Sequence, residues 1–241
     1  MNDIRFSRQL VIPEIGRNGQ RKLEEGKVLV VGAGGLGSPV LAYLAAAGVG
    51  TIGICDGDEV ELSNLNRQIL HSSETIGVSK AENAARFLQA LHPDVRSIPL
   101  PRRLNEQSLA EDWVKGYDLL IDCSDNFEAR FLLNQLALDE GIPLVHAAVI
   151  RWMGQATTFL PGGPCYRCLL PHEPKHLPTP AESGVLGTLP GIMGSIQATE
   201  AIKLLLGTGD LLAGRMLVFD GLRMAFETVP LRKRKGCPAC G

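Results

Sequence analysis

The sequence predicts an α/β fold: a mainly parallel sheet covered by helices on both faces, followed by antiparallel C-terminal strands. Short continuous apolar runs, such as VLVV and LLI, alternate with helical segments between residues 27 and 149. Such runs are typical of parallel strands, because crossover helices bury both faces of the sheet. After residue 150 the pattern changes: QATTFL alternates in polarity, and MLVFDG and AFETVP are typical of a closing hairpin.

The order of elements follows from the same patterns. Residues 5–26 are expected to be helical. Strands are expected at residues 27–31, 51–55, 95–99, 118–122 and 143–149, and helices at residues 35–47, 79–91, 105–115 and 126–140. The run IMGSIQATEAIKLLLG predicts a further helix that ends at a glycine. Residues 171–191 contain five prolines, a composition that excludes a regular element and predicts a crossover loop.

Length and composition point to one globular domain. The 241 residues are 45% hydrophobic and 21% charged, with a formal net charge of -2. We expect N-terminal helices at residues 1–26, a nucleotide-binding core at residues 27–150 and a C-terminal part at residues 151–241. The balanced charge gives no reason to expect binding to nucleic acid or a membrane. The N-terminus, MNDIRFSRQL, lacks the apolar core of a signal peptide, so we expect a cytoplasmic protein.

Four of the six cysteines form two C-x-x-C pairs, CYRC and CPAC. In a reducing compartment such pairs favour a tetrahedral zinc site over disulfides, with two separate redox or surface pairs as the alternative. Four thiolates leave zinc no open position, so the predicted role is structural. The site would tie the middle of the chain to its end through Cys165, Cys168, Cys237 and Cys240.

A glycine-rich turn follows the first strand. In VLVVGAGGLGSPVL an aliphatic strand leads into glycines and then into a helix, whose N-terminus supplies free N–H groups and a positive dipole. The glycines would let the backbone approach a polyphosphate: Gly32, Gly34, Gly35 and Gly37. Asp56 follows the second strand, where dinucleotide sites carry a ribose-binding acid. These features alone favour a nicotinamide-dependent oxidoreductase.

The polar segments that follow favour ATP instead. DGDEVELSNLNRQILH, residues 56–71, lies beyond the carboxyl edge of the sheet, where open α/β sheets bind ligands. Lys80 begins a later helix, and DCSDN places Asp125 after the fourth strand. Hydride transfer needs no such set of cations and acids. Nucleotidyl transfer uses cations to neutralise phosphate charge and a carboxylate to hold Mg²⁺. We therefore expect a Rossmann-like sheet that binds ATP.

Taken in order, GAGGLG, D-x-D, SNLNRQ, Lys80, DCSDN and the paired C-x-x-C motifs resemble the MoeB/ThiF/HesA family, bacterial relatives of the ubiquitin-activating enzymes. The resemblance spans nearly the whole chain, from RFSRQL to EAIKLLLG. It implies an adenylyltransferase that uses ATP to adenylate the C-terminal glycine carboxylate of a small ubiquitin-like sulfur-carrier protein with a Gly-Gly tail. The products would be an acyl-adenylate and pyrophosphate, and a sulfur donor would later form a thiocarboxylate.

The same resemblance implies roles for individual residues. Arg67 and Lys80 would stabilise charge on the α-phosphate and the departing pyrophosphate, and Asp125 would bind Mg²⁺. Arg8 would enter the active site of a partner subunit, which implies a homodimer. The remaining nucleotide contacts would come from the four turn glycines and from Asp56, Ser63, Asn64, Leu65, Asn66, Gln68 and Asn126.

One position departs from the family pattern. Many relatives carry a cysteine in the crossover segment where this chain has Pro180. Proline forms no thioester or acyl-persulfide, so we expect the reaction to stop at the acyl-adenylate. An external sulfur donor, a sulfurtransferase or a cysteine desulfurase, would then act on it. No fused donor domain is expected, because the chain ends just after the second C-x-x-C pair.

The basic run at residues 232–235 is interpreted as a solvated strand end, with a docking patch for an acidic carrier as the alternative. Three other functions stay open. The chain could be a family member that adenylates a peptide or non-protein carboxylate. It could be a nicotinamide oxidoreductase, or a non-catalytic module that retained the fold.

Overall fold

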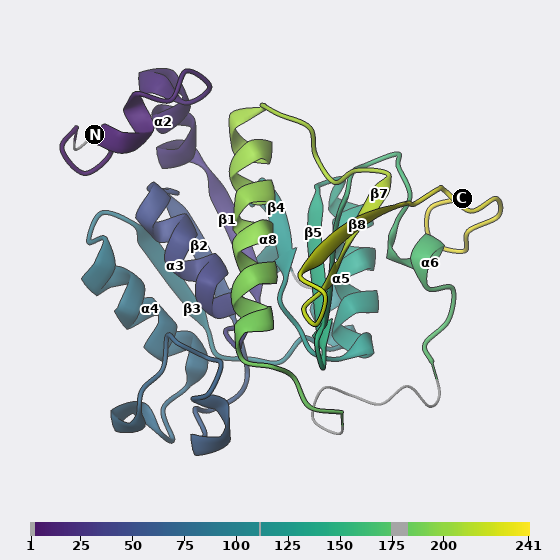
Figure 1. Cartoon of the computed structure of the whole chain (residues 1–241), viewed down its shortest axis with the longest axis horizontal. Coiled ribbons are helices and arrows are strands. Elements are labelled where there is room, and N and C mark those ends of the chain that lie inside the picture. Colours follow the sequence, from purple (N-terminus) through teal and green to yellow (C-terminus); the bar gives the residue numbers. More distant parts are fainter. Residues whose placement is uncertain (1–2, 111, 175–182) are drawn as a thin grey trace.

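One eight-stranded sheet organises the molecule (Figure 1). The computed structural model describes residues 3–110, 112–174 and 183–241. The strand order is β3-β2-β1-β4-β5-β6-β7-β8. The strands are β1 Lys27–Val31, β2 Thr51–Cys55, β3 Arg96–Leu100, β4 Leu119–Asp122, β5 Leu144–Ile150, β6 Met153–Phe159, β7 Arg215–Asp220 and β8 Ala225–Pro230. Strands β1 to β5 pair in parallel, whereas β6, β7 and β8 pair antiparallel, so the predicted change of pattern near residue 150 is confirmed.

Helices cover both faces of this sheet. The first face carries α3 (Gly37–Ala47), α4 (Lys80–Leu91) and α8 (Thr188–Leu206), and the other carries α5 (Phe127–Glu140) and the short α6 (Tyr166–Leu169). Strand β1 shows why the sequence reads as a continuous apolar run. Val28 and Val30 belong to the core under the first group of helices, and Leu29 and Val31 belong to the core under α5. Side chains on both faces of β1 are therefore buried.

The predicted helical region at the N-terminus is divided in two. Helix α1 (Ser7–Leu10) is short, and α2 (Gly16–Glu25) carries the longer run. Pro13 lies between them, and Gly16 has a φ of 50°, a left-handed conformation that favours glycine. A continuous helix through these residues is therefore excluded.

The predicted helix at residues 105–115 is wrong. The chain instead forms two short 3-10 segments, Glu106–Ala110 and Asp112–Val114. Asn105 and Ser108 exchange local bonds: Asn105 Oδ1 accepts from the backbone N–H of Ser108, and Ser108 Oγ accepts from the backbone N–H of Asn105, both at 3.1 Å. Such side chain to backbone bonds compete with the α-helical pattern. The indole N–H of Trp113 also donates to the carbonyl of Ser108, at 3.0 Å, which holds the segment in this form.

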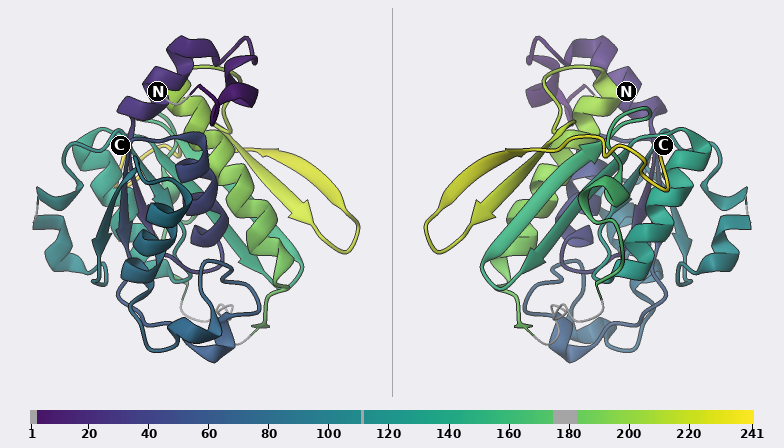
Figure 2. Two further views of the ribbon diagram at one scale, coloured as in Figure 1. Left: turned by 90° about the vertical axis from the view of Figure 1, so that its left-hand side faces the viewer. Right: turned by 90° about the vertical axis from the view of Figure 1, so that its right-hand side faces the viewer.

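The N-terminal helices and the C-terminal hairpin lie at the periphery of the sheet. Helices α1 and α2 lie at the amino-terminal edge of the parallel strands, at the top of Figure 1. The β7–β8 hairpin extends away from the body of the molecule (Figure 2). Among the described helices, none combines the length and the apolar character that a bilayer crossing requires.

Candidate active site

A cavity of about 450 Å³ lies where the chain leaves the carboxyl ends of β1, β2 and β4. Strand β1 pairs with β2 on one side and with β4 on the other, so the connections that follow β1 and β4 diverge at this point. Open α/β sheets bind ligands at such a topological switch point. The turn after β1, the polar loop after β2 and the loop after β4 all line this cavity.

The glycines of the turn have two different roles. Gly32 has a φ of 100°, and a Cβ built there would lie 2.5 Å from the carbonyl oxygen of Cys123. A Cβ on Gly37 would lie 2.0 Å from the carbonyl oxygen of Gly32. These two glycines are therefore required by the packing of the turn itself. Gly34 and Gly35 line the cavity together with Gly32, and a Cβ on Gly35 would lie 3.0 Å from Cβ of Pro190.

Asp56 supports the turn from the end of β2. Its Oδ2 accepts from the backbone N–H of Ala33 at 2.7 Å, and its Oδ1 accepts from the backbone N–H of Asp58 at 2.9 Å. Burial raises the pKa of Asp56, and the two N–H donors act in the opposite direction. Asp56 also lines the cavity, and its carboxylate oxygens keep lone pairs that these two bonds do not use.

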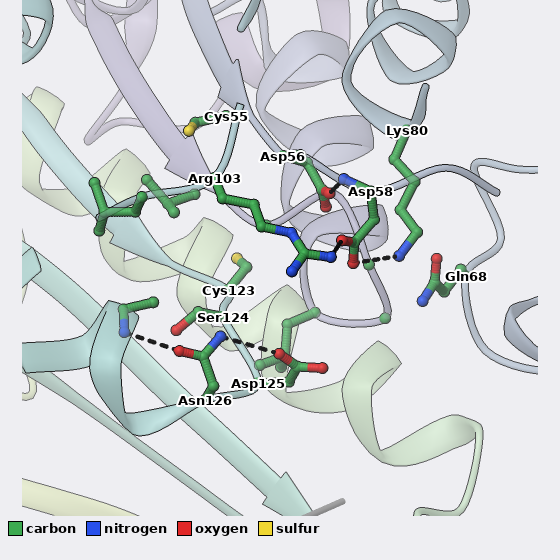
Figure 3. A pocket seen from close by; sticks show the side chains of 18 of the residues that line it. Cys55, Asp56, Asp58, Gln68, Lys80, Arg103, Cys123, Ser124, Asp125 and Asn126 are labelled. Atoms are coloured by element: carbon green, nitrogen blue, oxygen red, sulfur yellow. Dashed lines mark hydrogen bonds and ion pairs between the residues drawn. The ribbon is translucent and has the colours of Figure 1, made fainter. Parts of the chain in front are cut away.

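Asp58 lies between two cations at the centre of the site (Figure 3). Its carboxylate is 3.3 Å from Lys80 Nζ and 2.8 Å from Arg103 Nη2. Burial alone would raise the pKa of Asp58, but Lys80 and Arg103 hold it below its ordinary value. The Lys80 side chain is only 9% exposed. The sequence patterns predict a role for Lys80 but none for Asp58 or Arg103, although the D-x-D pattern contains Asp58.

The SNLNRQ segment contributes two of its residues to the cavity. Arg67 and Gln68 line it, and Arg67 Nη1 donates to the carbonyl of Ser63 at 3.1 Å. Gln68 is 5% exposed, and its Oε1 has no partner among the described residues. The other members named from the sequence lie outside the lining of the cavity: Ser63, Asn64, Leu65 and Asn66. Asn64 Oδ1 accepts from the backbone N–H of Glu61, so its side chain shapes the loop.

The loop after β4 presents Ser124, Asp125 and Asn126 to the cavity (Figure 3). Asn126 also begins α5, since its Oδ1 accepts from the backbone N–H of Ala129 at 2.9 Å. Asp125 is exposed, and its carboxylate accepts a long bond of 3.4 Å from the Asn126 side chain. Its oxygens are therefore accessible to a ligand or a cation.

A buried pair of hydrogen-bonded side chains anchors this loop from below. Asp122 is fully buried, with Oδ2 2.6 Å from Nδ1 of His146 and Oδ1 2.6 Å from Oγ of Ser124. Burial alone would raise the pKa of Asp122, but His146 and Ser124 hold it below its ordinary value. Asp122 therefore supports the site without lining the cavity. No spacing pattern in the sequence marks His146, so the sequence predicts no role for it.

Two sequence expectations concern residues away from the cavity. Arg8 is exposed on α1, which lies at the amino-terminal ends of the parallel strands, opposite the cavity. Its side chain makes no hydrogen bond or ion pair with the described residues. It therefore does not reach the cavity of its own chain. Pro180 lies outside the described residues.

The two C-x-x-C pairs come together beside α6. The sulfur atoms of Cys165, Cys168, Cys237 and Cys240 all lie within 4.8 Å of one another. Distances of 3.7 Å from Cys165 to Cys237 and 3.5 Å from Cys168 to Cys240 fit the roughly 3.8 Å edge of a tetrahedron with Zn–S bonds of about 2.3 Å. All four are free thiols, and the backbone N–H of Arg234 donates to Cys168 Sγ. The donor set and its spacing suit a zinc ion.

Comparison with known proteins identifies the family of this chain. Residues 6–239 match the ThiF family. The chain belongs to the ThiF family. It is 51% identical over 239 residues to the SAMP-activating enzyme E1 of Haloferax volcanii, with 98% of this chain and 88% of that protein covered. It is 46% identical to the sulfur carrier protein adenylyltransferase of Thermus thermophilus, with 98% of this chain and 90% of that protein covered.

A longer relative agrees with this assignment, and a solved structure shares the fold. The chain is 46% identical to the mouse adenylyltransferase and sulfurtransferase MOCS3. The match covers 99% of this chain but only 52% of MOCS3. The crystal structure of E. coli MccB with ATP matches with a TM-score of 0.84 and 22% identity, covering 100% of this chain and 75% of that chain. At this identity the match supports the fold, which agrees with the one predicted from the sequence.

Proposed function

We propose that this ThiF-family chain uses ATP to adenylate the C-terminal glycine carboxylate of a small ubiquitin-like sulfur-carrier protein. The observation that carries the proposal is the gathering of Lys80, Arg67 and Asp125 around one cavity beside the glycine turn. Two relatives at 46% and 51% identity, named for sulfur-carrier adenylation and SAMP activation, support the same reaction. The acyl-adenylate then passes to a separate sulfur donor, which forms the thiocarboxylate.

The reaction is an in-line displacement at phosphorus. One oxygen of the carrier carboxylate forms a bond to the α-phosphorus of ATP, and the bond from that phosphorus to the bridging oxygen of the β-phosphate breaks. Pyrophosphate leaves with the electron pair. No general base is needed, because a C-terminal carboxylate is ionised at neutral pH. Arg67 and Lys80 supply fixed positive charge, which matters most as negative charge increases in the transition state.

The nucleotide is held by groups on three loops. Gly34 and Gly35 provide backbone close to the phosphates, and the free lone pairs of Asp56 accept from the ribose hydroxyls. Gln68 and Asn126 are two of the neutral polar residues that line the cavity.

Asp125 is the residue that would hold Mg²⁺. It is an exposed carboxylate on the wall of the cavity, and hard oxygen donors of this kind suit magnesium, which keeps several waters and binds phosphates. The ion would neutralise phosphate charge when bound. The zinc suited to the four cysteines has no such task, because the four sulfurs fill its coordination sphere.

The proposal is tested by ATP–pyrophosphate exchange with purified ubiquitin-like carriers. We expect exchange only in the presence of a carrier that ends in Gly-Gly, because its carboxylate is the nucleophile. The matched control is the same carrier without its last two residues, which should give background exchange. Exchange that is equally fast without any carrier would refute a protein substrate. Tight NADH binding without ATP binding would instead support an oxidoreductase.

We also propose that the working form is a homodimer with Arg8 acting in the partner's cavity. Arg8 is exposed and lies at the far edge of its own sheet. Apolar side chains on the same segment are exposed as well, with Ile4 at 88%, Val11 at 76% and Ile12 at 41%. Exposed apolar residues beside an unused guanidinium are typical of an interface that brings the cation to a second site.

Complementation tests this arrangement. Arg8→Ala and Lys80→Met are each expected to be inactive as homodimers. In an equal mixture allowed to exchange subunits, half of the dimers combine the two variants, and each of these has one complete site. Activity should therefore return to about a quarter of the wild-type value. A mixture that stays inactive after subunit exchange is demonstrated would exclude action in trans.

A further inference from the structure

A circuit of hydrogen bonds links the glycine turn to the helix that carries Lys80. Its central member is His71, which is buried at 7% exposure in the loop between β2 and α4 and does not line the cavity. His71 Nε2 lies 2.9 Å from the carbonyl oxygen of Ala33, and His71 Nδ1 lies 2.8 Å from Nδ2 of Asn83. Ala33 is part of the glycine turn, and Asn83 lies one helical turn after Lys80 on α4.

The partners assign the position of the ring proton. The carbonyl of Ala33 only accepts, so Nε2 of His71 carries the hydrogen and donates it. Asn83 Nδ2 also donates to the carbonyl of Leu70 at 3.2 Å. A flipped amide would bring two acceptor oxygens together there, so Asn83 presents an N–H, and Nδ1 of His71 must accept. The ring is therefore neutral, with its hydrogen on Nε2.

The circuit closes on the other side of the turn. The backbone N–H of Ala33 donates to Asp56, so both polar backbone groups of Ala33 are held by side chains. Asp56 accepts in turn from the backbone N–H of Asp58, and the Asp58 carboxylate pairs with Lys80. The position of the turn is thus tied to the position of Lys80 by two separate routes.

We propose that neutral His71 is a positioning residue for ATP: it holds the glycine turn where the turn receives the phosphates, and this hold weakens when a proton binds to Nδ1 and the ring is pushed away from Asn83. A protonated ring would point Nδ1–H at the N–H of Asn83 across 2.8 Å, and this contact would become repulsive. The identity of the ligand as ATP rests on the proposed function. The hydrogen-bond arrangement does not.

Two charged groups act on the ring, Lys80 from α4 and Asp56 from the end of β2. Burial lowers the pKa of His71 below its ordinary value of 6.5, Lys80 acts in the same direction, and the Ala33 carbonyl and Asp56 oppose them. The turn contributes only the uncharged carbonyl. The lowered pKa favours the neutral ring, in agreement with the hydrogen bonds of both ring nitrogens.

Two substitutions of His71 distinguish the effect of losing its N–H donor from the effect of losing the imidazole ring. In His71→Gln the carboxamide N–H reaches the place of Nε2–H, so the affinity for Mg²⁺–ATP at pH 7.5 is expected to stay within about twofold of wild type. In His71→Leu the donor is lost, and the dissociation constant is expected to rise about fivefold to tenfold, the effect of one hydrogen bond. The control is His92→Leu, which removes a buried histidine bonded to the carbonyl of Ala45 at the opposite edge of the sheet. Equal ATP affinities in the two leucine variants would overturn the proposal.

A pH series adds a readout that a packing role would not change. ATP itself titrates near pH 6, so the non-titrating His71→Gln serves as the reference. Between about pH 7.5 and 5.5 the ATP dissociation constant of wild type is expected to rise more steeply than that of His71→Gln. Identical pH profiles for wild type and His71→Gln would overturn the proposal.

The tautomer can be measured without ATP. Long-range proton–nitrogen NMR of the labelled wild-type protein at pH 7.5 should show His71 with its hydrogen on Nε2. A hydrogen on Nδ1, or a doubly protonated ring at this pH, would overturn the proposal. If the NMR result holds but wild type binds no ATP, the proposed function fails and not the hydrogen-bond arrangement.

Discussion

Replacing Lys80 by methionine is expected to lower carrier-dependent pyrophosphate exchange by about 10²–10³-fold, the usual effect of removing one fixed charge from a developing anion. The ammonium group is largely withdrawn from solvent and lies 3.3 Å from Asp58 on the wall of the cavity. Methionine has a similar length and no charge. The fold should survive the change, because Arg103 still neutralises Asp58 at 2.8 Å.

The matched control is Lys22→Met. Lys22 donates to the carbonyl of Leu206 at 2.7 Å, and it lies on α2 at the far edge of the sheet. Exchange by this variant is expected to equal that of wild type. Thermal unfolding of both variants shows whether either has lost its structure. A folded Lys80→Met protein with wild-type exchange would remove Lys80 from the mechanism.

Cys237→Ser is expected to abolish zinc binding and to lower the unfolding temperature by about 6–12 °C, which corresponds to roughly 3 kcal/mol for a chain of this size. Cys237 is buried, and its sulfur lies 3.7 Å from that of Cys165. Without this ligand the site loses its closed tetrahedral set, and the C-terminal residues lose their attachment to α6. Metal analysis of the purified protein and a thermal scan measure the two effects.

Cys55→Ala is the control for the loss of a buried thiol. Cys55 lies at the end of β2, outside the four-cysteine cluster, and its thiol donates to the carbonyl of Arg102. We expect this variant to keep the full zinc content. A wild-type protein that contains no zinc, or a Cys237→Ser variant with unchanged zinc content and stability, would contradict a structural metal site.

The fold was largely predictable, because its strongest signals are local. The aliphatic run of β1 and the glycines that follow it predict a buried strand and a turn within one short segment. The failure at residues 105–115 has a local cause too, since Asn105 and Ser108 bond to each other's backbone in place of helical partners. Apolar periodicity does not report such polar bonds, so the pattern predicted the wrong element.

The lining of the candidate cavity was predictable only where a motif marked it. Lys80 and Asp125 stand in recognisable segments, but Arg103 does not. Arg103 meets Asp58 because Cys55 pairs with Leu100 in the sheet, and each charged residue follows its strand by three positions. His146 meets Asp122 for a similar reason, since the two are direct neighbours in the β4–β5 register. These contacts depend on strand order, which apolar patterns in one sequence do not specify.

The four-cysteine cluster determines what happens when the backbone is cut between its two pairs. With metal bound, the two pairs close a ring that runs from Cys168 to Cys237 and contains α8, β7 and β8. A protease that cuts the backbone once inside this ring produces two fragments that remain tethered through sulfur–metal bonds. Such a nicked molecule would elute as an intact protein under native conditions, and its two pieces would separate only after denaturation with a chelator.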